Sequence, residues 1–250
     1  MNRFFIAQPD ILGNLITLKD KKHIHHIKSV LHLELKEPLV VFDKDGNEYS
    51  CLISGLDENI VLEIKEKRIP DRSKAKVVFT IACAIPKKAK FDDIIDKLTQ
   101  LGVARIIPLV TERVIVKLNS EKEGARLGRW RKIAQSAAEQ SQRRDIPVID
   151  PIQKLKDILT KSRDFDLKLI PTLGGERESL KEVFSQSLPL PLPLPLNILV
   201  LIGPEGDFSD GEISLAKDAG FIPITLGDLT LRVDTAAVAI ASFIRFYAYD

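Results

Sequence analysis

A short apolar run that leads into a glycine-rich turn constrains the fold of this chain more than any other stretch. Residues 198–201 are Ile-Leu-Val-Leu, and residues 202–208 continue as Ile-Gly-Pro-Glu-Gly-Asp-Phe. In α/β proteins, ligands bind in loops that follow buried strands at the carboxyl edge of the sheet. Gly203 and Gly206 let the backbone approach a ligand closely, and Pro204 stiffens the turn between them. The segment therefore predicts a rigid binding loop.

The residues that follow this turn have the pattern of a helix start. Ser209 and Glu212 are spaced as a capping box, and Phe208 and Ile213 are spaced as a hydrophobic staple. Gly220 then marks the end of the helix. A strand, a binding loop and a helix are thus predicted in that order.

A second loop of the same kind lies nearer the C-terminus. Residues 222–226 predict a strand, Gly227 follows it, and residues 231–237 lead into a helix that is apolar on almost every side. Such a helix is buried, and a subunit interface is one place for it. Arg232 stands just ahead of this helix, which favours a functional role. The alternative is a structural ion pair with Asp234 or Glu205.

The chain as a whole predicts two domains. From residue 76 onward, strand-like runs alternate with helical ones, which favours a mostly parallel sheet. The runs that predict strands are 76–85, 105–110, 167–172, 198–202 and 222–226, and those that predict helices are 91–101 and 130–138. Residues 188–196 alternate leucine and proline and predict an extended spacer, with a docking motif as the alternative.

The first seventy residues predict a small β-rich domain. Residues 38–43 and 48–53 are strand-like and are joined through Asp45-Gly46, a hairpin signal. Residues 60–67 alternate as a half-buried strand, and a short helix is expected between residues 20 and 33. We therefore place the domain boundary between residues 72 and 73, in a linker at residues 70–73.

The net charge of +2 hides a concentration of positive charge in the middle of the chain. Residues 73–150 hold 16 Lys and Arg against 9 Asp and Glu, whereas residues 151–250 hold 10 against 14. The excess gathers between Arg126 and Arg144, with Lys87, Lys88 and Lys90 upstream. A concentrated basic face indicates a phosphate-rich partner, and a solvated helix face is the alternative.

The sequence also indicates what the chain lacks. No apolar run has the length of a membrane span, and no secretory leader is recognisable, so we expect a cytoplasmic protein. Cys51 and Cys83 lie in apolar strand-like runs and are expected to be reduced core residues rather than a disulfide. The histidines at positions 23, 25, 26 and 32 match no standard metal site, and paired rings on a helix face are the favoured interpretation.

Common nucleotide-binding and hydrolase motifs are missing as well. The sequence contains no Gly-x-Gly-x-x-Gly and no Gly-x-x-x-x-Gly-Lys, which argues against an ordinary dinucleotide or phosphate loop. Gly-x-Ser-x-Gly is also absent, so no serine hydrolase elbow is predicted.

Several motifs in the same order resemble the RsmE-type 16S ribosomal RNA (uracil-N3)-methyltransferase family, of the SPOUT (trefoil-knot) class. The resemblance covers nearly the whole chain. It rests on His25-His26 with Val30-Leu31, on residues 97–103 (Lys-Leu-Thr-Gln-Leu-Gly-Val), on Thr111-Glu112-Arg113, on Arg129-Trp130, on residues 137–141 (Ala-Ala-Glu-Gln-Ser), on Gly203-Pro204-Glu205-Gly206 and on Leu231-Arg232.

The resemblance implies a fold and an activity. It implies an N-terminal PUA-like β-barrel that binds RNA over residues 1–72, and a SPOUT α/β methyltransferase domain with a C-terminal trefoil knot over residues 73–250. It implies S-adenosyl-L-methionine as the methyl donor and N3 of one uridine in 16S rRNA, within the small ribosomal subunit, as the target. It further implies a homodimer, with no metal and no membrane partner.

The resemblance also assigns residues to roles. Donor binding falls to Thr172, Leu173, Gly174, Leu201, Ile202, Gly203, Pro204, Glu205, Gly206, Leu226, Gly227, Leu231, Arg232, Thr235 and Ala236. RNA binding is expected of Arg3, His25, His26, Lys28, Arg113, Arg129, Arg143 and Arg144. As uracil N3 loses its proton, negative charge builds on the ring oxygens, and Arg232 is the catalytic candidate to stabilise it. Glu205 is expected to orient the donor or its own loop, with proton acceptance as the second option.

The chain departs from the usual family pattern at several positions. Asp207 stands where glycine is usual, Asp234 and Gln100 where glutamate is usual, and His32 where arginine is usual. A side chain at Asp207 is expected to narrow the donor pocket. Two other functions stay open on the sequence alone: a SPOUT methyltransferase that acts on another RNA, and a non-catalytic RNA-binding factor for ribosome assembly.

Overall fold

The chain folds into two compact units. The computed structural model describes residues 2–69, 77–86, 91–113, 120–186 and 195–247. The first unit comprises residues 1–71 and 138–146, and the second comprises residues 72–137 and 147–250. The expected linker at 70–73, the lysines at 87, 88 and 90, and residues 188–194 of the leucine-proline run lie outside the described residues.

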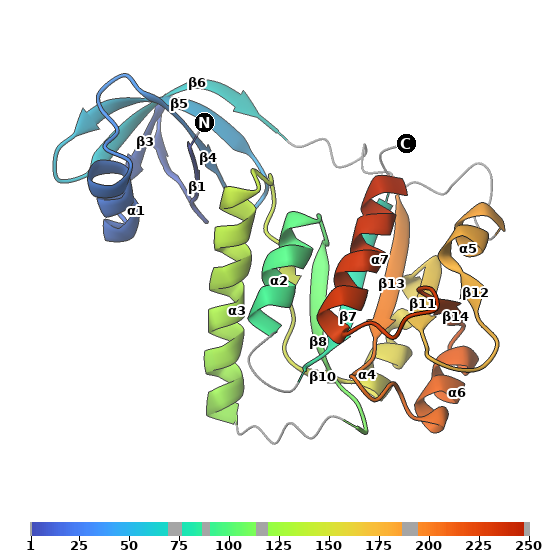
Figure 1. The fold of residues 1–250 in the computed structure, drawn as a ribbon. Helices are drawn as coiled ribbons and strands as arrows, with labels where there is room; N and C mark the ends of the chain where they lie inside the picture. The colour runs from blue at the N-terminus through green and yellow to red at the C-terminus, as the bar shows by residue number, and fades with distance from the viewer. Residues whose placement is uncertain (1, 70–76, 87–90, 114–119, 187–194, 248–250) are drawn as a thin grey trace. The chain divides into compact units, whose positions relative to one another are not determined.

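A six-stranded sheet forms most of the first unit (Figure 1). Its strands are β1 (Asn2–Phe5), β2 (Asp10–Leu12), β3 (Leu15–Leu18), β4 (Pro38–Phe42), β5 (Glu48–Leu56) and β6 (Ile60–Arg68). They lie in the order β1-β4-β5-β6-β3-β2, and only β1 and β4 run parallel to each other. Among the described residues, β1 and β2 are the two edges of this sheet and do not close it into a barrel.

Local sequence explains the hairpin between β4 and β5. The carboxylate of Asp43 accepts hydrogen bonds from the backbone N–H groups of Asp45 (2.9 Å) and Asn47 (3.0 Å). Gly46 has a φ of 81°, a conformation that glycine adopts without strain. The hairpin predicted from Asp45-Gly46 is therefore confirmed.

The expected short helix is present after β3. Helix α1 (Lys21–His25) begins at Asp20, whose carboxylate accepts from the N–H of Lys22 at 2.8 Å. It continues as a π-helical turn, η1 (His26–Val30), which buries Ile27 in the core of the first unit. The rings of His23 and His26 both pack edge-on against Phe4, at centroid distances of 5.7 and 5.8 Å. The paired-ring interpretation of the histidines holds for these two.

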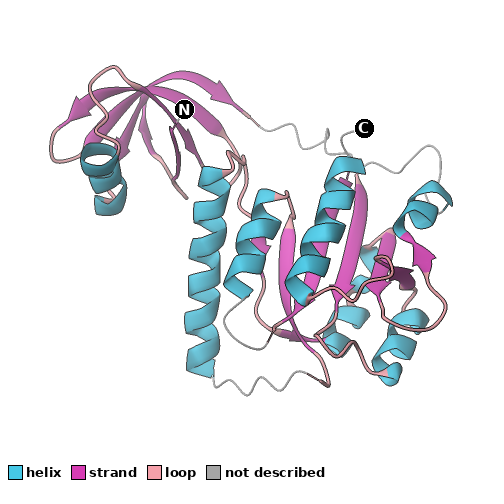
Figure 2. Ribbon diagram, in the orientation of Figure 1, coloured by secondary structure: helices cyan, strands magenta, loops and turns pink. Residues whose placement is uncertain are grey.

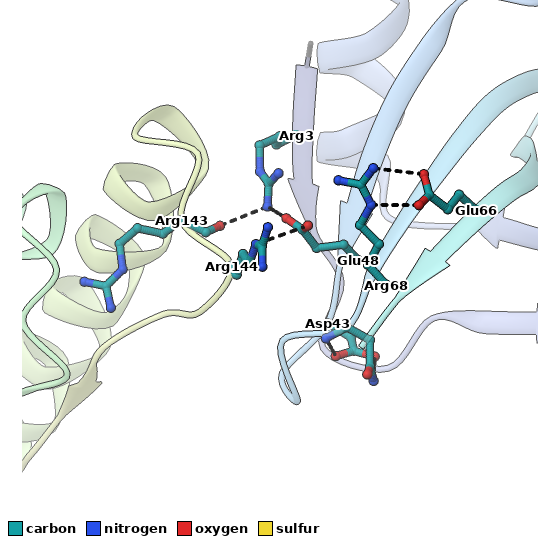
Figure 3. Close-up of polar contacts among 8 residues, drawn as sticks. Arg3, Asp43, Glu48, Glu66, Arg68, Arg143 and Arg144 are labelled. Carbon is teal, nitrogen blue, oxygen red and sulfur yellow. Dashed lines mark hydrogen bonds and ion pairs between the residues drawn. The ribbon is translucent and has the colours of Figure 1, made fainter. Parts of the chain in front are cut away.

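Residues 138–146 are held to the first unit by polar contacts that the sequence does not indicate (Figure 3). The N–H of Phe5 donates to the Glu139 carboxylate at 3.0 Å, which gives a partner to a backbone group of the edge strand β1. Arg3 donates to the carbonyl of Arg143 at 3.1 Å and pairs with the carboxylate of Glu48. Arg144 reaches the other oxygen of Glu48 at 3.4 Å. Glu48 thus joins two distant parts of the chain.

The second unit is built on a parallel sheet covered by helices (Figure 2). Its elements are β7 (Val77–Ala84), α2 (Phe91–Gln100), β8 (Arg105–Val110), α3 (Ser120–Gln140), β9 (Val148–Ile149), β10 (Gln153–Lys154), α4 (Leu155–Thr160), η3 (Ser162–Asp164), β11 (Leu167–Pro171), β12 (Glu178–Ser179), α5 (Leu180–Gln186), β13 (Leu196–Ile202), α6 (Asp210–Asp218), β14 (Ile222–Thr225) and α7 (Val233–Tyr247). The order is β10-β8-β7-β13-β11-β14-β12, with β9 also on β8, and every pair is parallel. The prediction of a mostly parallel sheet is confirmed.

The central strand β13 contains the apolar run at residues 198–201. It lies between β7 and β11, and residues 198–202 are all buried. Leu199 and Leu201 belong to a core cluster that includes side chains of α4 and α6. Helix α7 packs on α2, β7 and β13 and is absent from that cluster, so it covers the opposite face. A strand buried on both faces has no polar side to display.

Candidate functional site

The loops that follow three adjacent strands of the second unit enclose a cavity. Strands β13, β11 and β14 are neighbours in the sheet and run in one direction, so the loops after them share an edge. The cavity has about 560 Å³ of empty space, including space open to solvent. It is lined by Pro171, Thr172, Leu173, Arg177, Ile202, Gly203, Pro204, Glu205, Asp207, Thr225, Leu226, Gly227, Leu229, Leu231, Val233 and Ala236.

The loop after β13 is a tight turn packed over an aromatic ring. The N–H of Asp207 donates to the carbonyl of Pro204 at 3.0 Å, which closes the turn. A Cβ atom added to Gly203 would lie 2.9 Å from two carbon atoms of the Phe208 ring, which is 1% exposed. Glycine at position 203 is therefore required by packing within the protein. Gly203 also lines the cavity, so the close approach to a ligand that the sequence predicts stays a prediction.

Asp207 links this turn to the loop after β11. Its backbone has a φ of 62°, which aspartate tolerates better than most residues. One carboxylate oxygen accepts from the N–H of Leu173 at 2.7 Å, and the other accepts from the N–H of Phe208 at 2.8 Å. The side chain lines the cavity and joins two of the three loops.

The loop after β11 is also bonded to the third strand of the site. The N–H of Thr172 donates to the carbonyl of Ile224 in β14 at 3.1 Å. The carbonyl of Thr172 accepts from the guanidinium of Arg177 at 3.0 Å. Arg177 lines the cavity and was not among the predicted site residues. No local motif marks it, because its role depends on how the loop folds back.

The segment after β8 supports the loop after β13. The N–H of Glu112 donates to the Glu212 carboxylate at 2.9 Å, and the hydroxyl of Ser209 donates to Glu112 at 2.6 Å. Ser209 and Glu212 also form the capping box of α6 that the sequence predicts. Arg113 donates to the carbonyl of Gly206. Arg113, expected to bind RNA, therefore lies against the turn of the cavity.

Arg232 lies in the third loop, at the rim of the cavity. Its neighbours Leu231 and Val233 line the cavity, while Arg232 itself is exposed and does not. Its carbonyl accepts from the N–H of Ala236 at 2.8 Å, at the start of α7. Among the described residues, Arg232 forms no ion pair with Asp234 or Glu205. The structural pairing considered as an alternative is therefore absent from that part of the chain.

Two carboxylates near the cavity affect a buried thiol. Burial raises the pKa of the Cys83 thiol, and the carboxylates of Asp234 and Glu205 raise it further. Cys83 is fully buried in β7, in register with Ile202 of the cavity wall. Both carboxylates therefore act on a group just under the cavity. Cys83 and Cys51 are both free and buried, as predicted.

The structure brings most of the predicted donor-binding residues to the cavity. Those that line it are Thr172, Leu173, Ile202, Gly203, Pro204, Glu205, Leu226, Gly227, Leu231 and Ala236. Leu201 is buried in the core instead, and Gly174 lines an adjoining hollow. Gly206, Arg232 and Thr235 are outside the lining. The lining also includes residues that were not assigned to donor binding, namely Pro171, Arg177, Thr225, Leu229 and Val233, together with Asp207, which was expected to narrow the pocket.

The residues expected to bind RNA are spread over both units. Arg3, Arg143 and Arg144 take part in the contacts of residues 138–146 already described, and Arg143 also pairs with Asp145 at 2.9 Å. His25 and His26 are exposed, and Lys28 donates to the carbonyl of Asp57. Arg129 is 70% exposed and pairs with Asp92 of α2.

Two features are absent from the residues that the structure describes. None of their helices is long and apolar enough to cross a membrane. No three of their histidine, cysteine and acidic side chains are grouped so that they could hold a metal ion.

This chain is similar to known proteins over most of its length. The family described as "RNA methyltransferase domain" matches residues 73–245. Ribosomal RNA small subunit methyltransferase E of Mesomycoplasma hyopneumoniae is 33% identical, covering 95% of this chain and 96% of that protein. The protein of the same name from Synechocystis sp. is 31% identical, covering 96% of this chain and 76% of that protein. A solved structure of ribosomal RNA small subunit methyltransferase E from Neisseria gonorrhoeae, bound to S-adenosyl methionine, is 28% identical with a TM-score of 0.83, covering 99% of this chain and 98% of that one.

Proposed function

Because this chain belongs to the family of RNA methyltransferases that includes ribosomal RNA small subunit methyltransferase E, we propose that it methylates ribosomal RNA. The methyl donor is S-adenosyl-L-methionine, and the target is N3 of one uridine in the 16S rRNA of the small ribosomal subunit. The observation that carries this proposal is the cavity formed by the loops after β11, β13 and β14.

The lining of this cavity suits the donor. S-adenosyl-L-methionine carries a sulfonium and an ammonium, both positive, together with one carboxylate. The cavity offers the carboxylate of Glu205 and the guanidinium of Arg177. Apolar side chains such as Ile202, Leu226 and Leu231 supply the remaining surface.

The residues of the chain position the reactants and stabilise charge. When bound, the donor supplies an electrophilic methyl group on its sulfonium. Holding the target base in line with that methyl group accounts for much of the acceleration over the uncatalysed reaction. Arg232, at the rim, stabilises the negative charge that develops on the uracil oxygens. Glu205, in the wall, holds the positively charged part of the donor.

The RNA is held at both units. Arg129, His25 and His26 are exposed and contact the phosphate backbone, which positions the substrate without specifying its sequence. Arg113 donates to the carbonyl of Gly206 and thereby supports the turn of the cavity next to the bound RNA. The first unit serves as a PUA-like RNA-binding domain, and the protein acts on cytoplasmic ribosomal subunits.

The second unit is a SPOUT domain with a trefoil knot and acts as a homodimer. The strand order supports the knot, because β13 lies in the sheet between β7 and β11, which both come earlier in the chain. After β14, helix α7 returns to pack on α2 and β7. Two leucines at the cavity support the dimer. Leu173 is 51% exposed and Leu229 is 79% exposed, an apolar rim that a second subunit would cover.

The experiment that tests this function is transfer of labelled methyl from S-adenosyl-L-methionine to small ribosomal subunits that lack the modification. We expect 3-methyluridine in the 16S rRNA, identified by mass spectrometry of the nucleosides. Transfer to another RNA alone would replace the proposed target. If the protein shows no methyl transfer and does not bind the donor, the proposed enzymatic activity is refuted and a non-catalytic assembly factor is favoured.

A further inference from the structure

We propose that Asp207 is a positioning residue that sets the spacing of the donor loops. Its carboxylate ties the turn after β13 to the loop after β11 and thereby keeps the cavity between them in a shape ready for the donor. This inference rests on the proposed function, because it assigns the cavity to S-adenosyl-L-methionine.

The hydrogen bonds of Asp207 define this role. One carboxylate oxygen accepts from Leu173 in the neighbouring loop at 2.7 Å, and the other accepts from Phe208 in its own turn at 2.8 Å. Because each oxygen accepts a backbone N–H from a different loop segment, the carboxylate holds the turn after β13 and the loop after β11 together. Hydrogen bonds to a charged acceptor are the stronger kind.

The surrounding contacts make Asp207 the central part of a larger framework. On one side, the N–H of Thr172 donates to Ile224, which ties the loop after β11 to the strand that carries the third loop. On the other side, Arg113 donates to the carbonyl of Gly206, next to Asp207. Among the described residues, the bond from Asp207 to Leu173 links these two sets of contacts. Its loss would let the turn after β13 shift relative to the loop after β11.

Asp207 also stands between two hollows. Together with Thr172 it lines both the donor cavity and a second hollow on the side of α6. The second hollow includes Gly174, Gly175 and Lys217. A bond from Asp207 to the residue after Thr172 therefore forms part of the partition between the hollows. Opening it would widen the donor cavity toward α6.

The backbone conformation allows a clean substitution. Asp207 has a φ of 62°, which glycine adopts without strain. Asp207→Gly thus removes both side-chain hydrogen bonds, while the backbone can still adopt the conformation of the turn. Asp207→Asn keeps one carbonyl acceptor and tolerates the same φ. Asp210→Asn is the matched control, because Asp210 is exposed in the first turn of α6, lines only the second hollow and loses the same charge.

Two measurements on the full-length chain test the inference. Hydrogen exchange of the Leu173 amide in the absence of any ligand reports the bond itself. Calorimetric titration with S-adenosyl-L-methionine reports the cavity, and steady-state kinetics separate the KM for the donor from kcat. For Asp207→Gly we expect Leu173 to exchange at least about tenfold faster and the donor to bind about tenfold more weakly, as befits loss of charged hydrogen bonds. The value of kcat at saturating donor should stay within about twofold, Asp207→Asn should be intermediate, and Asp210→Asn should match the unsubstituted protein.

The outcomes separate this inference from the proposed function. Unchanged exchange of the Leu173 amide in Asp207→Gly would overturn the inference. If donor binding were nevertheless weaker, Asp207 would contact the donor directly. Equal loss of binding in Asp210→Asn would overturn it too, because charge alone would then be the cause. If the unsubstituted protein bound no donor, the proposed function would fail first, whatever the exchange of Leu173.

Discussion

Replacement of Gly203 by alanine should destabilise the second unit by steric conflict alone. The added methyl group would lie 2.9 Å from two carbon atoms of the Phe208 ring, closer than real Cβ atoms approach their neighbours. The ring is 1% exposed and belongs to the core cluster that includes side chains of α4 and α6, so it has no free space to enter. Overpacking of this kind costs about 1–3 kcal/mol.

Trp130 provides the assay. It is the only tryptophan of the chain, is 3% exposed, and packs on Phe91 within the second unit. Its fluorescence therefore follows the unfolding of that unit in urea or on heating. For a unit of this size, each kcal/mol corresponds to about 2–4 °C in Tm. Gly203→Ala should lower Tm accordingly and weaken donor binding, because the turn carries part of the cavity wall.

Two further variants make the reasoning refutable. Gly174→Ala is the matched control, because an added Cβ at Gly174 meets nothing within 4 Å, and it should change stability little. Phe208→Leu creates space at the ring, so the double variant Gly203→Ala/Phe208→Leu should be less destabilised than the sum of the two single variants, by about 0.5–3 kcal/mol. Full additivity, or a Gly203→Ala protein as stable as Gly174→Ala, would show that the methyl–ring conflict is not the cause.

The remaining predictions concern catalysis, RNA binding and alkaline pH. Arg232→Ala should lower kcat by about 10²–10³-fold, or about 3–4 kcal/mol, with donor affinity unchanged; near-normal turnover would reject the role. Arg129→Gln should weaken RNA binding and flatten its dependence on salt, because Arg129 is 70% exposed, and an unchanged slope in filter-binding titrations would exclude a phosphate contact there. Burial raises the pKa of Cys51 to about 12 and also raises that of Cys83, whereas an unfolded thiol titrates near 9. The unfolded state therefore releases these protons first, so stability present below pH 9 should fall as pH rises from about 9 to 12; a flat free energy of unfolding over that range would contradict it.

The sequence predicts well what short-range patterns determine. The buried strand that ends at Ile202, the capping box of Ser209 and Glu212, and the Asp45-Gly46 hairpin are all present. Each depends on residues a few positions apart, whose side chains satisfy neighbouring backbone groups. The loops around the cavity were placed by the same means, through a strand followed by a glycine-containing turn.

Contacts between residues that are far apart in the chain correspond to no local pattern in the sequence. The bond from Asp207 to Leu173 spans 34 positions, and neither residue's neighbours indicate the other. Asp207 was expected only to narrow the pocket. Likewise, Arg3 and Arg144 meet at Glu48, although they are far apart in the chain. The sequence shows the charge of an arginine but not its partner, so these contacts could not be predicted from it.

The place of β13 also bears on how the protein is made. This strand pairs with β7 and β11, both of which leave the ribosome before it. Between the end of β7 at Ala84 and the start of β13 at Leu196, more than a hundred further residues must be synthesised. At about 5–20 residues per second, one edge of β7 waits roughly 5–20 s for its partner. During that time the backbone N–H and C=O groups along this edge of β7 have no strand partner, so the edge is open to pairing with another chain.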